Sequence, residues 1–305
     1  MTSSPLELTA PPSRLQRLLA MNGVRLGLAL VVTALAGALT ARLLHAHTQG
    51  LLHALAPGLG GAAAALAAYV LYVRLVERRR PDELAASAAP RELALGLLGG
   101  AALVTLVVAG LAALGVYRFE GLNAHPTRLA AALSEMVFAG VLEELLLRAV
   151  VLRLLERWWG SWAALALSAL LFGLLHLPGE GMNLLALTTT VAAGVLLGAA
   201  YLATRRLWQS IALHAGWNFT LGSVFSIAVS GHDVARGLLL GRLSGPDWLT
   251  GGAYGLEASA LTLVLLLGGS AGLLARAAAH GTLRPRNKTQ AKPAMGEQTP
   301  VAAQG

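Results

Sequence analysis

Stretches of about twenty apolar residues alternate with short polar segments along most of the chain. A helix rises about 1.5 Å per residue, so a stretch of this length spans the roughly 30 Å hydrocarbon core of a bilayer. The sequence contains eight such stretches, and we expect each to form a transmembrane helix. They cover residues 24–44, 51–76, 93–117, 129–153, 161–177, 184–203, 208–230 and 257–279. The pattern predicts an all-α, polytopic membrane protein with about eight transmembrane helices and a polar site inside the membrane.

The stretches divide the chain into three parts. We expect residues 1–23 to form a cytoplasmic N-terminal segment and residues 24–279 to form the eight-helix membrane domain. Residues 280–305 are polar and lack periodicity, which predicts a disordered cytoplasmic tail. The first apolar stretch admits a second interpretation as a signal peptide, but it exceeds the roughly 7–15 residues of a signal core, which favours an uncleaved anchor.

Composition agrees with a membrane protein and excludes an ordinary soluble enzyme. Hydrophobic residues make up 56% of the chain and charged residues 12%, about half of the roughly 25% typical of soluble domains. The chain has no cysteine, which excludes a disulfide framework, a thiolate metal site and a cysteine nucleophile.

The polar segments that join the apolar stretches are alternately rich and poor in basic residues. Of the 23 Lys and Arg, 17 lie in segments on the same side of the membrane as the N-terminus. The five on the other side are Arg42, Arg118, Arg128, Arg236 and Arg242, and Arg148 lies inside a stretch. Because basic segments stay in the cytoplasm, both termini are expected there. We therefore attribute the excess of basic residues to the orientation of the protein in a lipid bilayer. We expect no nucleic acid partner.

Polar side chains inside the apolar stretches are the candidates for function, because an ionisable group in a membrane is costly unless it has a partner. Glu144 and Arg148 are four residues apart with the acid first, the favourable order for an ion pair on a helix. Glu143 points about 100° away from Glu144 and is free to meet other helices.

Two further stretches carry polar residues at the same spacing. Phe172 shares a helix face with His176, and His214 shares one with Asn218. Each pair alone is weak evidence, because a histidine in a membrane often serves only packing. Together the three stretches offer a carboxylate, two imidazoles and an amide, a combination that can activate a water beside a carbonyl.

The order of these residues resembles a known family. Glu-Glu-Leu-Leu-Leu-Arg at 143–148, Phe-Gly-Leu-Leu-His at 172–176 and His-Ala-Gly-Trp-Asn at 214–218 are similar to the EExxxR, FxxxH and HxxxN motifs of the CPBP (CAAX processing and bacteriocin processing, Abi-type) intramembrane proteases. The resemblance covers about residues 79–279, including Arg-Pro-Asp-Glu-Leu at 80–84. Leu147 and Ala149 depart from the common pattern, which bears on packing around Arg148.

The resemblance implies a membrane-embedded endopeptidase that acts on a protein or peptide, in CAAX-type or bacteriocin-type processing, with a prenylated substrate as one case. By analogy Glu143 is the general base and His176 helps to hold the water. His214 and Asn218 then donate to the oxyanion, while Glu144, Arg148 and Phe172 support the site. We expect a multi-pass protein of the bacterial inner membrane, with a substrate that enters from the membrane or its cytoplasmic face.

Two questions stay open at this point. Glu143, His176 and His214 could hold Zn²⁺ or another divalent metal, since two histidines and a glutamate are a reasonable zinc triad; a metal-free, glutamate-dependent mechanism also fits, and the chain lacks a His-Glu-x-x-His pair. The polar residues could also serve a non-enzymatic binding or immunity factor, or a proton-coupled carrier.

Depth raises a difficulty for a single site. Counted from the cytoplasmic ends of their stretches, Glu143 lies about 15 Å deep, His214 about 9 Å and His176 about 22 Å. Convergence requires either a later start for the stretch at 161–177 or a site nearer the middle of the bilayer.

Overall fold

The computed structural model describes residues 21–286, and the expectations for residues 1–20 and 287–305 lie outside the described residues. The described chain is mostly helical. Its long helices are α2 (Asn22–His47), α3 (Gly50–Tyr72), α4 (Ala89–Ala113), α5 (Leu129–Glu144), α6 (Arg153–Leu175), α7 (Leu184–Thr204), α8 (Trp208–Phe219) and α10 (Ala260–Ala279). Each coincides with one of the eight predicted stretches, which confirms the helical fold class.

Short elements extend or connect these helices. Wider π-type turns continue α3 (Val73–Glu77), α5 (Leu145–Leu152) and α8 (Thr220–Val224). Asp82–Leu84 and Ala86–Ala88 form 3-10 turns before α4, and α9 (Asp247–Thr250), Gly252–Tyr254 and Leu256–Ala258 precede α10. Helix α6 contains a kink at Gly160, where a φ of 77° and a ψ of 172° interrupt the helical backbone. The predicted start of the fifth stretch at residue 161 therefore agrees with the structure.

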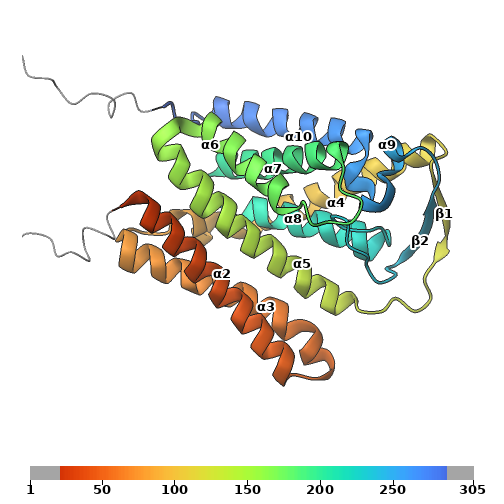
Figure 1. Ribbon diagram of the computed structural model, residues 1–305, viewed down its shortest axis with the longest axis horizontal. Helices are drawn as coiled ribbons and strands as arrows, with labels where there is room; N and C mark the ends of the chain where they lie inside the picture. The colour runs from red at the N-terminus through yellow and green to blue at the C-terminus, as the bar shows by residue number, and fades with distance from the viewer. Residues whose placement is uncertain (1–20, 287–305) are drawn as a thin grey trace, which may run out of the picture.

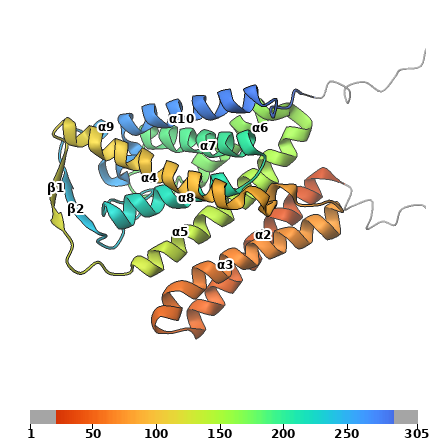
Figure 2. The same ribbon diagram turned by 180° about the vertical axis from the view of Figure 1, so that it is seen from behind.

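The helices form one bundle with two distinct ends (Figures 1 and 2). We call the end where α2 begins and α10 ends the basic end, and the opposite end, where the two strands lie, the sheet end. The α2–α3 hairpin packs along α5, while α4 pairs with α8 and α7 lies between α6 and α10.

Within residues 21–286, five helical segments are long and apolar enough to cross a membrane by length and composition. They are Asn22–His47, Gly50–Glu77, Asp82–Ala113, Leu184–Thr204 and Ala260–Ala279. The other three long helices, α5, α6 and α8, include the stretches that carry the polar motifs. The structure thus supports an all-α membrane protein.

Close approach of α4 and α8 depends on glycine. A Cβ atom added to Gly100 would lie 2.6 Å from the backbone nitrogen of Trp217 and would also clash with the carbonyl of Leu213, and one added to Gly96 would clash with α8 at Gln209. Small residues allow helix backbones to approach closely inside a membrane. These two glycines therefore fix α8 against α4.

The sheet end departs from the purely helical expectation. Strand β1 (Tyr117–Leu122) pairs antiparallel with β2 (Leu239–Leu243), two segments expected to be loops. Residues 231–256, which contain β2, α9 and the turn Gly252–Tyr254, form the other part of the sheet end. Trp248 is exposed there, whereas Tyr254 is fully buried and hydrogen-bonds Thr190 at 3.1 Å between hydroxyl oxygens.

The residues that follow α10 contact the kink in α6. The backbone nitrogen of Ser161 donates to the carbonyl of Arg284 at 2.9 Å, and the Ser161 hydroxyl accepts from the Arg284 backbone nitrogen at 2.8 Å. These contacts hold residues 282–286 beside the kink at Gly160, because the kink leaves backbone groups there without partners inside the helix.

Candidate active site

Glu144 and Arg148 form the buried ion pair that their spacing predicts. Arg148 Nη1 donates to Glu144 Oε1 at 2.7 Å, and both side chains are 0% exposed. Arg148 lies in the π-type turn that continues α5, a distortion that often marks functional sites. A second donor, Arg148 Nη2, reaches the carbonyl of Gly194 on α7 at 3.0 Å, so the arginine ties α5 to α7.

Glu144 also joins α5 to α8. The Ser210 hydroxyl donates to Glu144 Oε2, and His214 Nδ1 lies 3.1 Å from Glu144 Oε1. Because a carboxylate only accepts, the hydrogen on His214 is on Nδ1, which leaves Nε2 of that ring free for another group. One glutamate therefore neutralises an arginine and orients a histidine at the same time.

Glu143 occupies a different environment from its neighbour. Its side chain is partly exposed and, among the described residues, makes neither a hydrogen bond nor a salt bridge. It lines a cavity of about 370 Å³, which we call the wide cavity, together with His176, His214 and Asn218. The sequence-based separation of the two carboxylates thus agrees with the geometry.

His176 caps the end of α6 and turns one nitrogen toward the same cavity. Its Nδ1 lies 2.8 Å from the carbonyl of Phe172, which fixes the hydrogen on Nδ1 and frees Nε2. The Phe172 ring lies 4.5 Å from the His176 ring and 5.8 Å from the His214 ring, and Arg148 sits 4.9 Å from its centre. Phe172 is thus the common packing surface for both histidines and the arginine.

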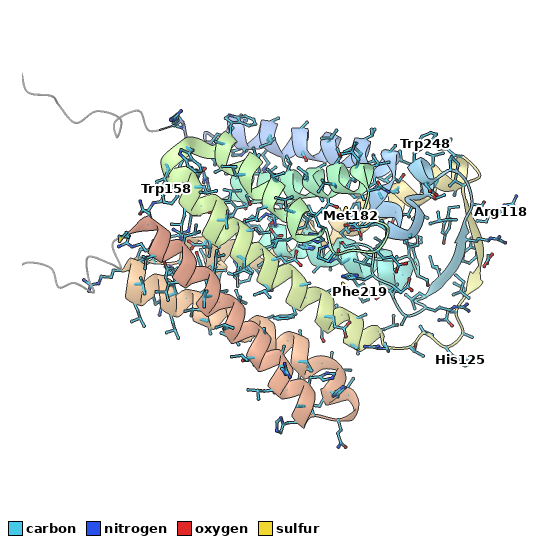
Figure 3. All side chains as sticks on the ribbon, viewed as in Figure 1. Arg118, His125, Trp158, Met182, Phe219 and Trp248 are labelled. Carbon is cyan, nitrogen blue, oxygen red and sulfur yellow. The ribbon has the colours of Figure 1, made fainter. Side chains whose placement is uncertain are left out.

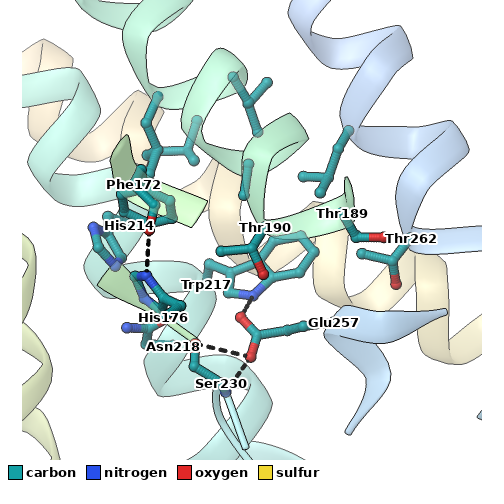
Figure 4. Close-up of a pocket in the computed structure, with 15 residues that line it drawn as sticks. Phe172, His176, Thr189, Thr190, His214, Trp217, Asn218, Ser230, Glu257 and Thr262 are labelled. Atoms are coloured by element: carbon teal, nitrogen blue, oxygen red, sulfur yellow. Dashed lines mark hydrogen bonds between the residues drawn. The ribbon is translucent and has the colours of Figure 1, made fainter. Parts of the chain in front are cut away.

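Asn218 lies one turn after His214 on α8. The side chain is almost buried, and its amide makes no hydrogen bond within residues 21–286. It borders the wide cavity and also a second, small one of about 40 Å³, which Figure 4 shows between α6, α7, α8 and residues 230 and 257. The amide is therefore available to a group inside either cavity.

The structure resolves the difference in depth. Helix α8 begins inside the bundle and not at its end. Gln209, at the start of α8, packs against Gly96 of α4, and Gly96 lies seven residues, or about 10 Å, after the first residue of α4. The turn at 82–85 holds that start: Glu83 carbonyl accepts from the Leu207 nitrogen and Ala85 carbonyl from Trp208 Nε1, both at 3.0 Å. His214 consequently lies deeper than its own helix suggests.

The sequence interpretation missed Glu257, which contributes to the small cavity from the turn before α10. Glu257 accepts hydrogen bonds from Trp217 Nε1 at 3.0 Å and from the backbone nitrogen and hydroxyl of Ser230 (Figure 4). Burial raises the pKa of the Glu257 carboxyl above its usual range, although these donors and His176 act against that rise. Its position at the edge of an apolar stretch was the available signal.

The predicted metal triad does not assemble. Within the part of the chain that the structure describes, no group of three His, Asp or Glu side chains is arranged to hold a metal ion. Glu143, His176 and His214 all line the wide cavity, but they do not come together as a three-residue ligand set. The described residues therefore do not fit a metal site, and the side chains themselves supply the acid, the base and the hydrogen-bond donors.

These features define an integral membrane protein of helical class with a polar site inside its bundle. The comparison with protein families agrees: a family described as type II CAAX prenyl endopeptidase Rce1-like matches residues 125–220, the range that contains all three motifs. The match confirms the resemblance to the CPBP-type CAAX proteases and points to a membrane peptidase. Neither the curated proteins nor the solved structures gave a match to this chain.

Proposed function

We propose that the protein is an intramembrane endopeptidase that hydrolyses a peptide bond with a water activated by Glu143. The observation that carries the proposal is the division between two adjacent glutamates. Glu144 is held by Arg148, Ser210 and His214, whereas Glu143 faces the cavity shared with both histidines and Asn218. The family match over the same residues supports peptide hydrolysis as the reaction.

In this mechanism Glu143 takes a proton from a water that also donates to Nε2 of His176. The water oxygen attacks the carbonyl carbon of the scissile bond, and the carbonyl oxygen becomes an oxyanion. The Asn218 amide and a doubly protonated His214, through Nε2, donate hydrogen bonds to that oxyanion. Cleavage of the carbon–nitrogen bond follows, and the proton on Glu143 passes to the leaving amine.

The remaining motif residues position these groups. Glu144 fixes the hydrogen of His214 on Nδ1 and thereby the direction of Nε2. Arg148 balances the charge of Glu144, and Phe172 sets the distance between the two histidine rings. A positioned base contributes typically 10²–10⁴-fold in rate and one oxyanion donor about 10²–10³-fold.

The substrate is a protein or peptide, and the choice between CAAX-type and bacteriocin-type processing belongs to the same proposal. The protein is a multi-pass protein of the bacterial inner membrane with both termini in the cytoplasm. This orientation is supported by the basic residues, most of which lie on elements at the basic end of the bundle.

The test is cleavage of a peptide library by the purified protein in detergent, read by mass spectrometry. The library includes C-terminal CAAX peptides with and without a prenyl group, and leader peptides. We expect products with the unaltered protein, in the presence and in the absence of a strong chelator, and none with Glu143→Gln. Equal turnover by Glu143→Gln would contradict the proposed base.

A further inference from the structure

The wide cavity extends along helix α5 from the polar site toward one end of the bundle. It begins at Glu143 and follows one face of α5 through Ala139 and Glu135 to Leu129, the first residue of the helix. This path covers fourteen residues, or about 21 Å along the axis. The facing wall is formed by the segment 229–237, which leads into β2. The cavity therefore opens at the sheet end.

Closely packed side chains separate the basic end of the bundle from Glu143 and the two histidines. Leu145, Ala149, Leu152 and Leu207 are fully buried on that side of the ion pair. Beyond them, Glu77 and Glu83 bind Arg79 and Arg153 in a compact network of salt bridges. A chain that approached from the basic end would have to separate this core.

Charge assigns a side of the membrane to each end. Among the described residues, thirteen arginines lie at the basic end, on or beside α2, α6, α10 and the turns at 78–91 and 205–206. Five lie at the sheet end, and these are Arg42, Arg118, Arg128, Arg236 and Arg242. Because positively charged segments remain in the cytoplasm, the sheet end faces the opposite compartment.

Aromatic side chains support the same two surfaces. Trp158 lies near the basic end and Trp248 at the sheet end (Figure 3). Trp248 is exposed, as are Trp159 and Trp162, which lie on α6 with Trp158. Tryptophan is enriched at both boundaries of a bilayer. The bundle therefore spans the membrane with its cavity open at one boundary.

The lining of the mouth indicates what enters it. Arg128, Glu135, His232 and Asp233 line the outer part, and Arg128 pairs with Glu135 at 3.4 Å in an exposed position. Leu129, Met136, Val229 and Val234 add apolar surface to the same cavity, so its lining is mixed and suits the amides and varied side chains of a peptide. The volume of about 370 Å³ lies within the roughly 300–1,000 Å³ of ligand sites.

We propose that the site takes an extended peptide segment from the non-cytoplasmic side of the membrane, so that the substrate is a polypeptide already translocated. This inference rests on the proposed function for the act of cleavage. It replaces the expected entry from the cytoplasmic face, because the cavity opens at the end that carries few basic residues.

The chain has no native cysteine, so single cysteines report on each face without a modified background. Ala235→Cys places a thiol at the exposed mouth, and Ser87→Cys places one in an exposed position at the basic end. We expect a membrane-impermeant maleimide to label Ala235→Cys in intact cells and Ser87→Cys only after permeabilisation. Labelling of Ser87→Cys but not of Ala235→Cys in intact cells overturns the orientation.

Entry is tested on the same two variants after purification. A bulky maleimide on Ala235→Cys is expected to reduce cleavage of the best library peptide at least tenfold, and the same reagent on Ser87→Cys to leave it unchanged. Full cleavage by the modified Ala235→Cys protein overturns the entry route. If the unmodified variants and the native chain cleave no peptide, the proposed function fails, while the labelling pattern still decides the orientation.

Discussion

His214 Nδ1 lies 3.1 Å from Oε1 of Glu144, the same oxygen that accepts from Arg148 at 2.7 Å. The Glu144–Arg148 ion pair therefore holds the Nδ1 side of the His214 ring, while the ring also lines the wide cavity. The neighbouring Glu143, free of such bonds among the described residues, faces the same space. Adjacent residues of one chemical type therefore have different tasks.

The first prediction separates those tasks by stability. Glu144→Gln removes the charge that balances the buried Arg148, and breaking a buried pair in this way costs about 3–5 kcal/mol. Glu143→Gln removes no described hydrogen bond and is expected to change stability by less than about 0.5 kcal/mol. Thermal unfolding of both purified variants measures the difference. Equal melting temperatures would contradict the assigned roles.

A second prediction concerns the packing that carries His214 and Asn218. Gly100→Ala places a Cβ against the backbone of α8 at Leu213 and Trp217, and such overpacking costs typically 1–3 kcal/mol. Gly99→Ala on the same helix meets nothing within 4 Å and serves as the matched control. We expect Gly100→Ala to lower both the melting temperature and kcat, and Gly99→Ala to lower neither. Native activity in Gly100→Ala would contradict the dependence of the site on this contact.

A third prediction addresses the oxyanion. Asn218→Ala is expected to lower kcat by about 10²–10³-fold, as for other side-chain donors of this type, with little change in KM. Steady-state kinetics on the best library peptide gives both constants. A rise in KM with kcat unchanged would instead place Asn218 in substrate binding, against the role assigned here.

A fourth prediction uses the position of Glu257. Because burial raises the pKa of this carboxyl, its protonated form is favoured in the folded protein. The resulting stabilisation is complete below the unfolded pKa of about 4.3 and is lost as pH rises through the folded pKa. The melting temperature of the native protein should therefore fall relative to that of Glu257→Gln as pH increases from about 4. A difference that moves the other way would contradict the raised pKa.

Much of the fold could be predicted because each helix needs about twenty apolar residues, a requirement visible without tertiary information. The pairing of Glu144 with Arg148 was likewise local, since both residues lie on one helix four positions apart. Contacts between residues that are far apart in the sequence could not be predicted from spacing along one helix. The start of α8 depends on the turn that contains Glu83 and on glycines of α4, so the depth of His214 could not be counted along its own helix.

The sheet end was the least predictable region. Strands β1 and β2 are more than a hundred residues apart in sequence and were expected to be loops, because neither shows a strong alternating pattern. Tyr254 has the type of an interfacial residue but is buried. Glu257 hydrogen-bonds Ser230 and Trp217, and both partners are distant in the sequence and come close to it only in the folded chain.

The central claim is that Glu143 activates the water, and its most direct test is a paired substitution. Glu143→Gln and Glu120→Gln make the same chemical change, the first in the cavity and the second at an exposed position on β1. The measurement is kcat/KM on the best library peptide, with melting temperatures to confirm folding. We predict a loss of at least about 10²-fold for Glu143→Gln and native activity for Glu120→Gln. Native activity in a folded Glu143→Gln protein would contradict the account.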